Sequence, residues 1–107
     1  MSEYINDTMR EMLDKLEKTR NISSDKTIEL GLNVYSLCVE ANYETGMAFA
    51  LWCIGLAYLN MSKYQNAISY LFDSINMSQK LGICDLQLLA YLTIGDIYFD
   101  IGEYEKS

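Results

Sequence analysis

The most restrictive feature of the sequence is an internal repeat with a spacing of 40 residues. The segment at residues 50–59 is matched by the segment at residues 90–99, and both place isoleucine, glycine and tyrosine at equivalent positions. A turn and a further tyrosine, Tyr64 or Tyr104, follow each segment. Within each unit the apolar residues recur at helical spacing. A repeat of this length predicts helical pairs that stack on one another and share one continuous core.

Helical spacing of apolar residues extends over almost the whole chain and predicts five helices. The chain contains no proline, which favours long, uninterrupted helices. The expected helices cover residues 3–20, 26–41, 44–60, 63–81 and 85–101. Short turns between helices require antiparallel neighbours, and therefore helical hairpins. The third helix is apolar nearly all round, which predicts burial from more than one side.

Capping residues indicate where these helices begin and end. Ser24 or Asp25 is the expected N-cap of the second helix. Asn42 and Gly82 suit the left-handed conformation that commonly ends a helix. Gly102 is expected to open a further turn, after which the last residues begin a sixth helix. We therefore expect the chain to continue in the natural protein.

The repeated motif resembles that of the tetratricopeptide repeat family. In that family an apolar, a small and an aromatic residue follow in order on the first helix of each pair. The matching residues are Ile54, Gly55 and Tyr58, and then Ile94, Gly95 and Tyr98. Ala67 matches the small residue of the second helix. Glycine allows helix backbones to approach closely, so we expect both glycines at helix crossings.

The sequence departs from the family pattern at several positions. Leu71 stands where the family usually has a large aromatic residue, Ser74 where it has alanine, and Gln79 where a proline closes the repeat. The spacing is also longer than the usual ~34 residues of the family. In this respect the chain is similar to the longer-repeat branch found beside bacterial signalling domains.

The resemblance implies an all-α domain in which antiparallel hairpins stack as a short right-handed solenoid. Residues 1–42 would form a degenerate first hairpin, residues 43–82 the second, and residues 83–107 the first helix of a truncated third. In the family, the first helices line a concave face that holds peptides or extended segments of partner proteins. Transferred by position, this face comprises Phe49, Trp52, Leu56, Leu59, Leu89, Leu92, Asp96, Phe99 and Asp100.

Two interpretations of this face remain open at the level of sequence. Trp52, the only tryptophan, is either an anchor in the groove or a core residue between hairpins. Asp96 and Asp100 either form part of an acidic rim that selects a basic partner or belong to a solvated helix face.

The function that the resemblance implies is a protein- or peptide-binding scaffold, as the sensory or docking segment of a larger bacterial signalling protein. The alternative is an oligomerisation module that pairs attached effector domains, such as nucleotide cyclase, kinase or DNA-binding domains. Under either function we expect the chain to self-associate through its last helix, as a two-fold dimer or a swapped hairpin, because the apolar face of that helix lacks cover inside the chain. The residues expected to mediate this self-association are Tyr91, Ile94, Tyr98 and Ile101.

Composition and charge restrict the partners and the cellular location expected for this chain. The net charge of −7 disfavours nucleic acid and anionic membranes as partners. The chain begins without a signal-peptide pattern, and its longest apolar run is too short to span a bilayer, so we expect a cytoplasmic protein.

The residue types that catalysis and metal binding require are also scarce. The chain has no histidine, and it has neither a glycine-rich phosphate loop nor metal-ligand spacing. We therefore expect no enzymatic activity, no metal and no cofactor. Cys38, Cys53 and Cys84 are widely spaced in apolar stretches, and we expect all three to be buried and reduced.

Overall fold

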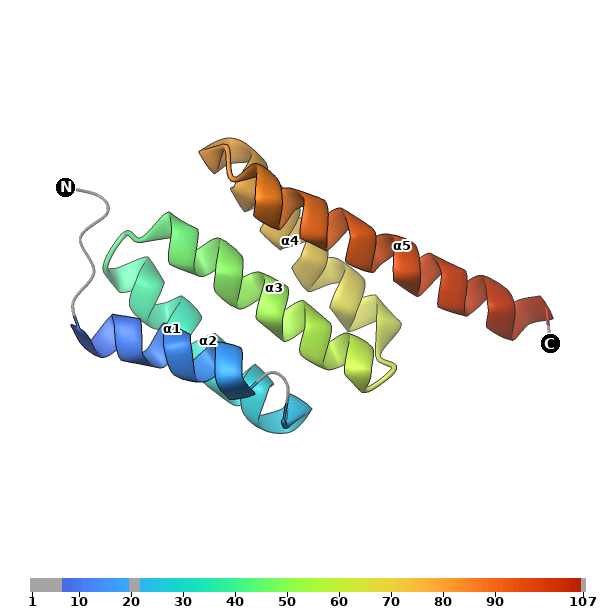
Figure 1. Cartoon of the computed structure of the whole chain (residues 1–107), viewed down its shortest axis with the longest axis horizontal. Helices are drawn as coiled ribbons and strands as arrows, with labels where there is room; N and C mark the ends of the chain where they lie inside the picture. Colours follow the sequence, from blue (N-terminus) through green and yellow to red (C-terminus); the bar gives the residue numbers. More distant parts are fainter. Residues whose placement is uncertain (1–6, 20–21, 107) are drawn as a thin grey trace.

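The structure, a computed structural model, describes residues 7–19 and 22–106, with side chains for residues 10–19 and 22–102. Over these residues the fold consists of α-helices, without any strand (Figure 1). The helices are α1 (Asp7–Thr19), α2 (Ser24–Glu40), α3 (Glu44–Asn60), α4 (Tyr64–Leu81) and α5 (Cys84–Lys106). The expected all-α class and the five helices are confirmed.

The turns after α2, α3 and α4 share one geometry. Each has a residue with positive φ just beyond the helix: Asn42 at 56°, Ser62 at 60° and Gly82 at 73°. The next backbone N–H then donates to the carbonyl oxygen five residues earlier, at 2.8–2.9 Å in all three turns. These bonds satisfy carbonyls that the end of a helix leaves unpaired. Asn42 and Gly82 were expected here, whereas Ser62 in the turn after α3 was not, because a serine seldom adopts this conformation.

Two of the expected helix boundaries are wrong. The N-cap of α2 is Ser23, whose hydroxyl accepts a hydrogen bond from the backbone N–H of Lys26 at 3.3 Å. Gly102 opens no turn, because α5 continues through it to Lys106. Gly82 is the only described glycine with a positive φ, so Gly102 lacks the left-handed conformation that ended the earlier helices.

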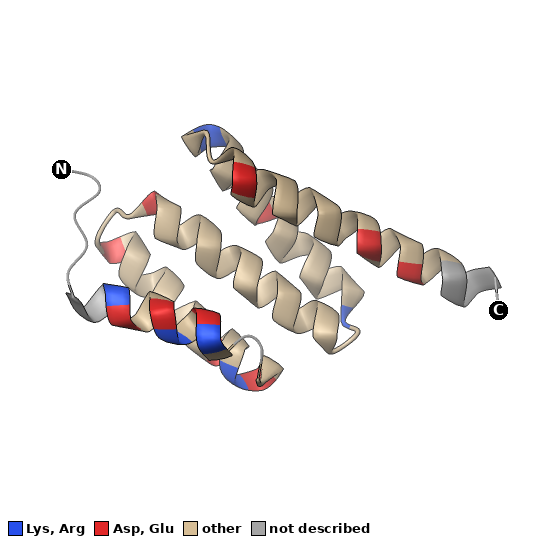
Figure 2. Cartoon of the chain, viewed as in Figure 1, with Lys and Arg blue, Asp and Glu red and all other residues tan. Residues whose placement is uncertain are grey.

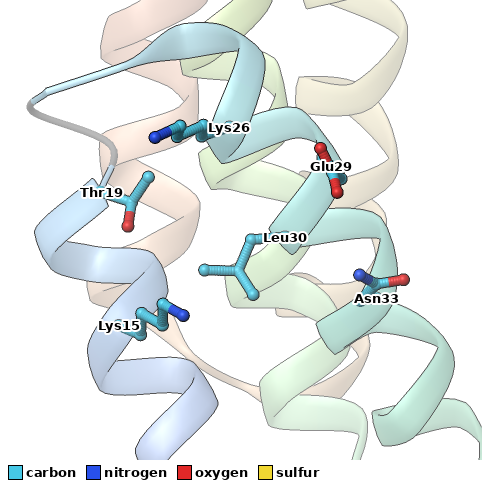
Figure 3. A pocket seen from close by; sticks show the side chains of 6 residues that line it. All are labelled: Lys15, Thr19, Lys26, Glu29, Leu30 and Asn33. Carbon is cyan, nitrogen blue, oxygen red and sulfur yellow. The ribbon is translucent and has the colours of Figure 1, made fainter.

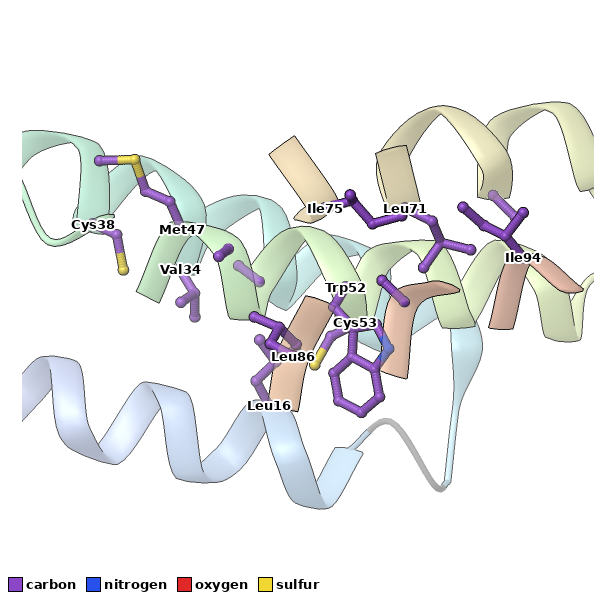
Figure 4. Packing of buried hydrophobic residues seen from close by; sticks show 14 of the residues in the cluster. Leu16, Val34, Cys38, Met47, Trp52, Cys53, Leu71, Ile75, Leu86 and Ile94 are labelled. Atoms are coloured by element: carbon purple, nitrogen blue, oxygen red, sulfur yellow. The ribbon is translucent and has the colours of Figure 1, made fainter. Parts of the chain in front are cut away.

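Helix α3 occupies the centre of the fold, with α2 on one side and α4 on the other (Figure 1). More than half of its residues are buried, as predicted from the apolar residues on nearly all sides of this helix. Helix α1 packs mainly on α2, and α5 packs mainly on α4. The core therefore runs through all five helices (Figure 4), and its buried members include Leu16, Val34, Cys53, Leu71, Ile75, Leu86 and Ile94.

The 40-residue spacing of the sequence is also the spacing of buried positions. The paired buried residues of α2 and α4 are Thr27 and Ala67, Gly31 and Leu71, Val34 and Ser74, and Cys38 and Ser78. The buried residues of α5 likewise correspond to buried residues of α3: Leu86 to Gly46, Ala90 to Ala50, Ile94 to Ile54, and Ile97 to Ala57. Residues 40 positions apart are thus buried at equivalent positions of their helices.

Glycines allow the closest helix contacts in this core. A Cβ added to Gly55 in α3 would lie 2.8 Å from Cγ of Leu71 in α4, which confirms the expected crossing. A Cβ on Gly31 in α2 would lie 2.6 Å from Cγ1 of Ile54 in α3. The same expectation for Gly95 is wrong, because no described atom lies within 4 Å of its added Cβ. Helix α5 has a neighbour on its α4 side, but none of the described residues covers Gly95.

We predict that the two repeat-equivalent glycines respond oppositely to leucine. Gly55→Leu overpacks the α3–α4 crossing and lowers the free energy of unfolding by about 1–3 kcal/mol. Gly95→Leu meets no neighbour, and the better helix propensity of leucine raises the free energy of unfolding by up to about 0.8 kcal/mol. Urea unfolding followed by circular dichroism measures both. Equal midpoints for the two variants would show that the helix crossings have been assigned wrongly.

Candidate functional site: a groove across three helices

A groove runs across α1, α3 and the start of α5. Its first part is a hollow of about 370 Å³ between α3 and α5. The residues lining this hollow are Glu17, Thr45, Phe49, Trp52, Ile83, Asp85, Leu86 and Leu89. Its second part is a hollow of about 380 Å³ between α1 and α3. That hollow is lined by Arg10, Leu13, Asp14, Glu17, Tyr43, Thr45, Gly46 and Phe49.

The two hollows adjoin, because Glu17, Thr45 and Phe49 line both of them. We call the whole surface the α1–α3–α5 groove. In the order of the chain, α1 and α3 are the first helices of the pairs α1–α2 and α3–α4. Helix α5 follows these pairs and occupies the equivalent place. The groove is therefore formed by the equivalent members of successive helical pairs.

The floor of the groove is apolar and partly aromatic. The rings of Phe49 and Trp52, one turn apart on α3, have centroids 5.9 Å apart and are tilted by 48°. Trp52 is only 8% exposed, so most of its ring belongs to the core (Figure 4), and the remainder lies on the floor of the groove. Leu89 contributes from α5 and is 44% exposed. Such aromatic and aliphatic surface is what partner side chains commonly bury in an interface.

The edges of the groove are mainly acidic. Asp14 and Glu17 lie on α1 and Asp85 lies in the first turn of α5, whereas Arg10 is the one basic residue that lines the groove. Asp14 also forms an exposed ion pair with Lys18 at 3.1 Å, which contributes little stability. The charges on α1 and α5 are seen in Figure 2. A ligand with basic groups and apolar side chains would complement this arrangement.

The structure brings together some of the residues that the sequence placed on a concave face. Phe49, Trp52 and Leu89 line the groove. Leu56 and Leu59 are half-buried further along α3 and do not line either hollow. The remaining four are exposed along α5 beyond the groove: Leu92, Asp96, Phe99 and Asp100. For Trp52, the two interpretations are not exclusive, because its ring contributes to both the core and the groove floor.

Several groove residues were missed because the first helix matched the repeat pattern poorly. Helix α1 supplies Arg10, Leu13, Asp14 and Glu17, and so forms one wall. The available signal was its amphipathic pattern, in which Leu13 and Leu16 share a face while the charged residues border it. When a helix packs through one narrow apolar face, the side chains beside that face lie at the rim of the contact. There they can line a groove.

The residues expected to mediate self-association do not share one surface. Tyr91 and Tyr98 are exposed on α5, but Ile94 is buried and Ile101 is half-buried. The expectation that Ile94 lies on an uncovered face is wrong. At helical spacing, Ile94 falls on the same side of α5 as Ala90 and Ile97, and this side forms the buried contact within the chain.

A third hollow, of about 430 Å³, lies between α1 and α2 (Figure 3). Its lining is mostly polar: Lys15, Thr19, Lys26, Glu29, Leu30 and Asn33. The two lysines and the glutamate are exposed, so solvent screens their charges. The hollow offers no apolar floor and no buried polar group, and the α1–α3–α5 groove is the better candidate site.

The cysteines differ in exposure. Cys38 and Cys53 are buried as expected, but Cys84 is exposed at the start of α5, because the turn after α4 places it outside the core. Burial raises the pKa of the Cys38 thiol to about 11. Among the described residues, no three histidine, cysteine, aspartate or glutamate side chains are grouped so that they could hold a metal ion. The described helices also include none with the length and apolar character needed to cross a membrane.

Comparison with protein-family models, curated proteins and solved structures finds no match to this chain.

We predict that the thiols differ sharply in reactivity. At pH 8, Cys84 reacts rapidly with Ellman's reagent because it is exposed. Cys38 and Cys53 react only on unfolding, because burial blocks access and keeps the Cys38 thiol protonated. Absorbance titration measures the thiols released before and after urea is added. The Cys84→Ser variant should lose the rapid phase, and a rapid phase that persists would contradict the assigned burial.

Proposed function

We propose that this chain is a helical repeat module that binds a segment of another protein in the α1–α3–α5 groove. The observation that carries the proposal is the combination of an aromatic floor, Phe49 and Trp52, with acidic edges in one continuous groove. A ligand segment would bury apolar side chains on the floor and place basic side chains at Glu17 and Asp85. Arginine suits both surroundings, because its planar cation also stacks on aromatic rings.

The arrangement of the helices supports a solenoid of the tetratricopeptide type. The buried positions repeat with the period of the sequence, and the helices that line the groove are those that would be the first of each pair. In that family the equivalent concave face holds peptides. We accordingly propose that the module serves as a sensory or docking segment of a larger signalling protein, acting by binding and not by catalysis.

We predict that peptides selected for binding to the intact chain are basic and contain large apolar residues. A display library of random 12-residue peptides supplies the probes, and fluorescence anisotropy measures their affinity. Leu89→Lys places a cation in the groove and removes apolar contact. It should weaken the binding of a selected peptide by about tenfold or more, which corresponds to roughly 1.4 kcal/mol.

The matched control is Leu32→Lys, since Leu32 is also helical and 44% exposed but lies on α2, away from the groove. It should leave the affinity unchanged. Peptides without basic residues, or equal losses for the two variants, would exclude the groove as the binding site.

A further inference from the structure

The side of α5 that lines the groove continues along the helix beyond the hollow as a strip of exposed residues. The strip comprises Asp85, Leu89, Leu92, Asp96 and Asp100, and all five are exposed. At helical spacing these residues lie within about 80° of one another around the helix axis. Asp85 and Leu89 line the hollow between α3 and α5, so the other three lie on the groove side of the helix as well. We call these five residues the α5 strip.

The equivalent side of α3 forms the floor of the groove. Thr45, Phe49 and Trp52 line the hollow from α3, and they stand 40 residues before the first three members of the α5 strip. Figure 1 shows that α3 and α5 run in the same direction. The α5 strip therefore borders the groove at its start and extends the same surface past the hollow.

The two helices that border the hollow differ in charge. Glu44, in the first turn, is the only charged residue of α3. The α5 strip contains three aspartates, and the described side chains of α5 include no lysine or arginine (Figure 2). Among the described residues, none forms an ion pair with these aspartates. The surface thus has a neutral, partly aromatic side on α3 and an acidic side on α5.

The aspartates stand at both ends of an apolar stretch. Asp85 precedes Leu89 and Leu92, whereas Asp96 and Asp100 follow them. With a rise of about 1.5 Å per residue, Asp85 is about 16 Å from Asp96 and about 22 Å from Asp100 along the helix axis. An extended peptide of 12 residues spans up to about 40 Å. A short segment can therefore reach both ends of the strip at once.

We propose that the α5 strip extends the binding site, and that the ligand is a segment with two basic groups separated by apolar residues. One basic group lies at Asp85 and the second at Asp96 and Asp100, while the apolar residues between them contact Leu89, Leu92 and the aromatic floor. Charges matched at two places fix the register of the ligand and disfavour ligands with one basic group. This inference rests on the proposed function, because the ligand is the segment that the groove binds.

The probe for the test is a labelled 12-residue peptide from the display selection described above, titrated with the intact chain by fluorescence anisotropy. Asp96→Lys with Asp100→Lys reverses the charge at the far end of the strip and leaves the lining of the hollow unchanged. It should weaken peptide binding by about tenfold, because two attractive contacts become repulsive. Added salt should reduce this difference, since exposed charges are screened.

A milder variant keeps the test valid if the lysine variant does not fold, which thermal unfolding followed by circular dichroism determines. Asp96→Asn with Asp100→Asn removes the charges and nearly preserves the shape of the side chains. It should weaken binding in the same direction and by a smaller factor.

The matched control is Glu29→Lys with Asp73→Lys, which changes the net charge by the same amount. Both carboxylates are exposed, lie on α2 and α4 and do not line the groove. This variant should leave the affinity unchanged. A second control replaces the basic residues at one end of the peptide by glutamine. At one of the two ends, this replacement should remove the effect of the Asp96 and Asp100 substitutions, as expected for groups in direct contact.

Four results would overturn the proposal. If only Leu89→Lys weakens binding, the ligand is confined to the hollow, and the proposed function stands without the extension. Equal losses in the control variant would show an effect of overall charge. A dimer in light scattering that the peptide dissociates would make a second copy the occupant of the strip. If no selected peptide responds to Leu89→Lys, the groove function fails and the extension fails with it.

Discussion

The contact of α3 with helices on both of its sides is the interaction on which the rest of the fold depends. Helices meet this closely only where a side chain is small or missing, and two glycines meet that condition. Gly31 of α2 makes room for Ile54, and Gly55 of α3 makes room for Leu71. Since α1 packs chiefly on α2 and α5 chiefly on α4, the positions of both outer helices follow from these two crossings. The groove exists because α1 and α5 then flank α3 on the same side.

The fold was largely predictable because its signals are local. Apolar periodicity located the helices, and Asn42 and Gly82 marked two of their ends through the backbone conformations these residues tolerate. Errors arose where a residue does not adopt the backbone conformation that its type prefers. Ser62 adopts a positive φ although its type does not predict it, and Gly102 stays helical although glycine commonly ends a helix. In both cases the backbone conformation differs from the usual preference of the residue type, which is the only signal that local sequence offers.

The candidate site was less predictable than the fold, because it depends on which neighbours are present. Repeat equivalence correctly brought Phe49, Trp52 and Leu89 to one surface. It did not anticipate the wall supplied by α1, since that helix matches the repeat poorly. Repeat equivalence also placed Gly95 at a helix crossing, because its counterpart Gly55 lies at one. A packing role needs a second helix, and the sequence of one helix specifies its face but not whether that face is covered.

The one-sided attachment of α5 has a consequence for how the molecule moves. Among the described helices, α5 contacts only α4 and, to a smaller extent, α3, whereas α3 is held from several directions. Local opening is easiest for elements with few buried contacts, so the backbone amides of α5 should exchange hydrogen with solvent faster than those of α3. The exposed C-terminal half should exchange fastest. Any molecule that covered the free side of α5 would slow this exchange without altering the average structure. Binding at that side would thereby change the rigidity of α5, which also lines the groove.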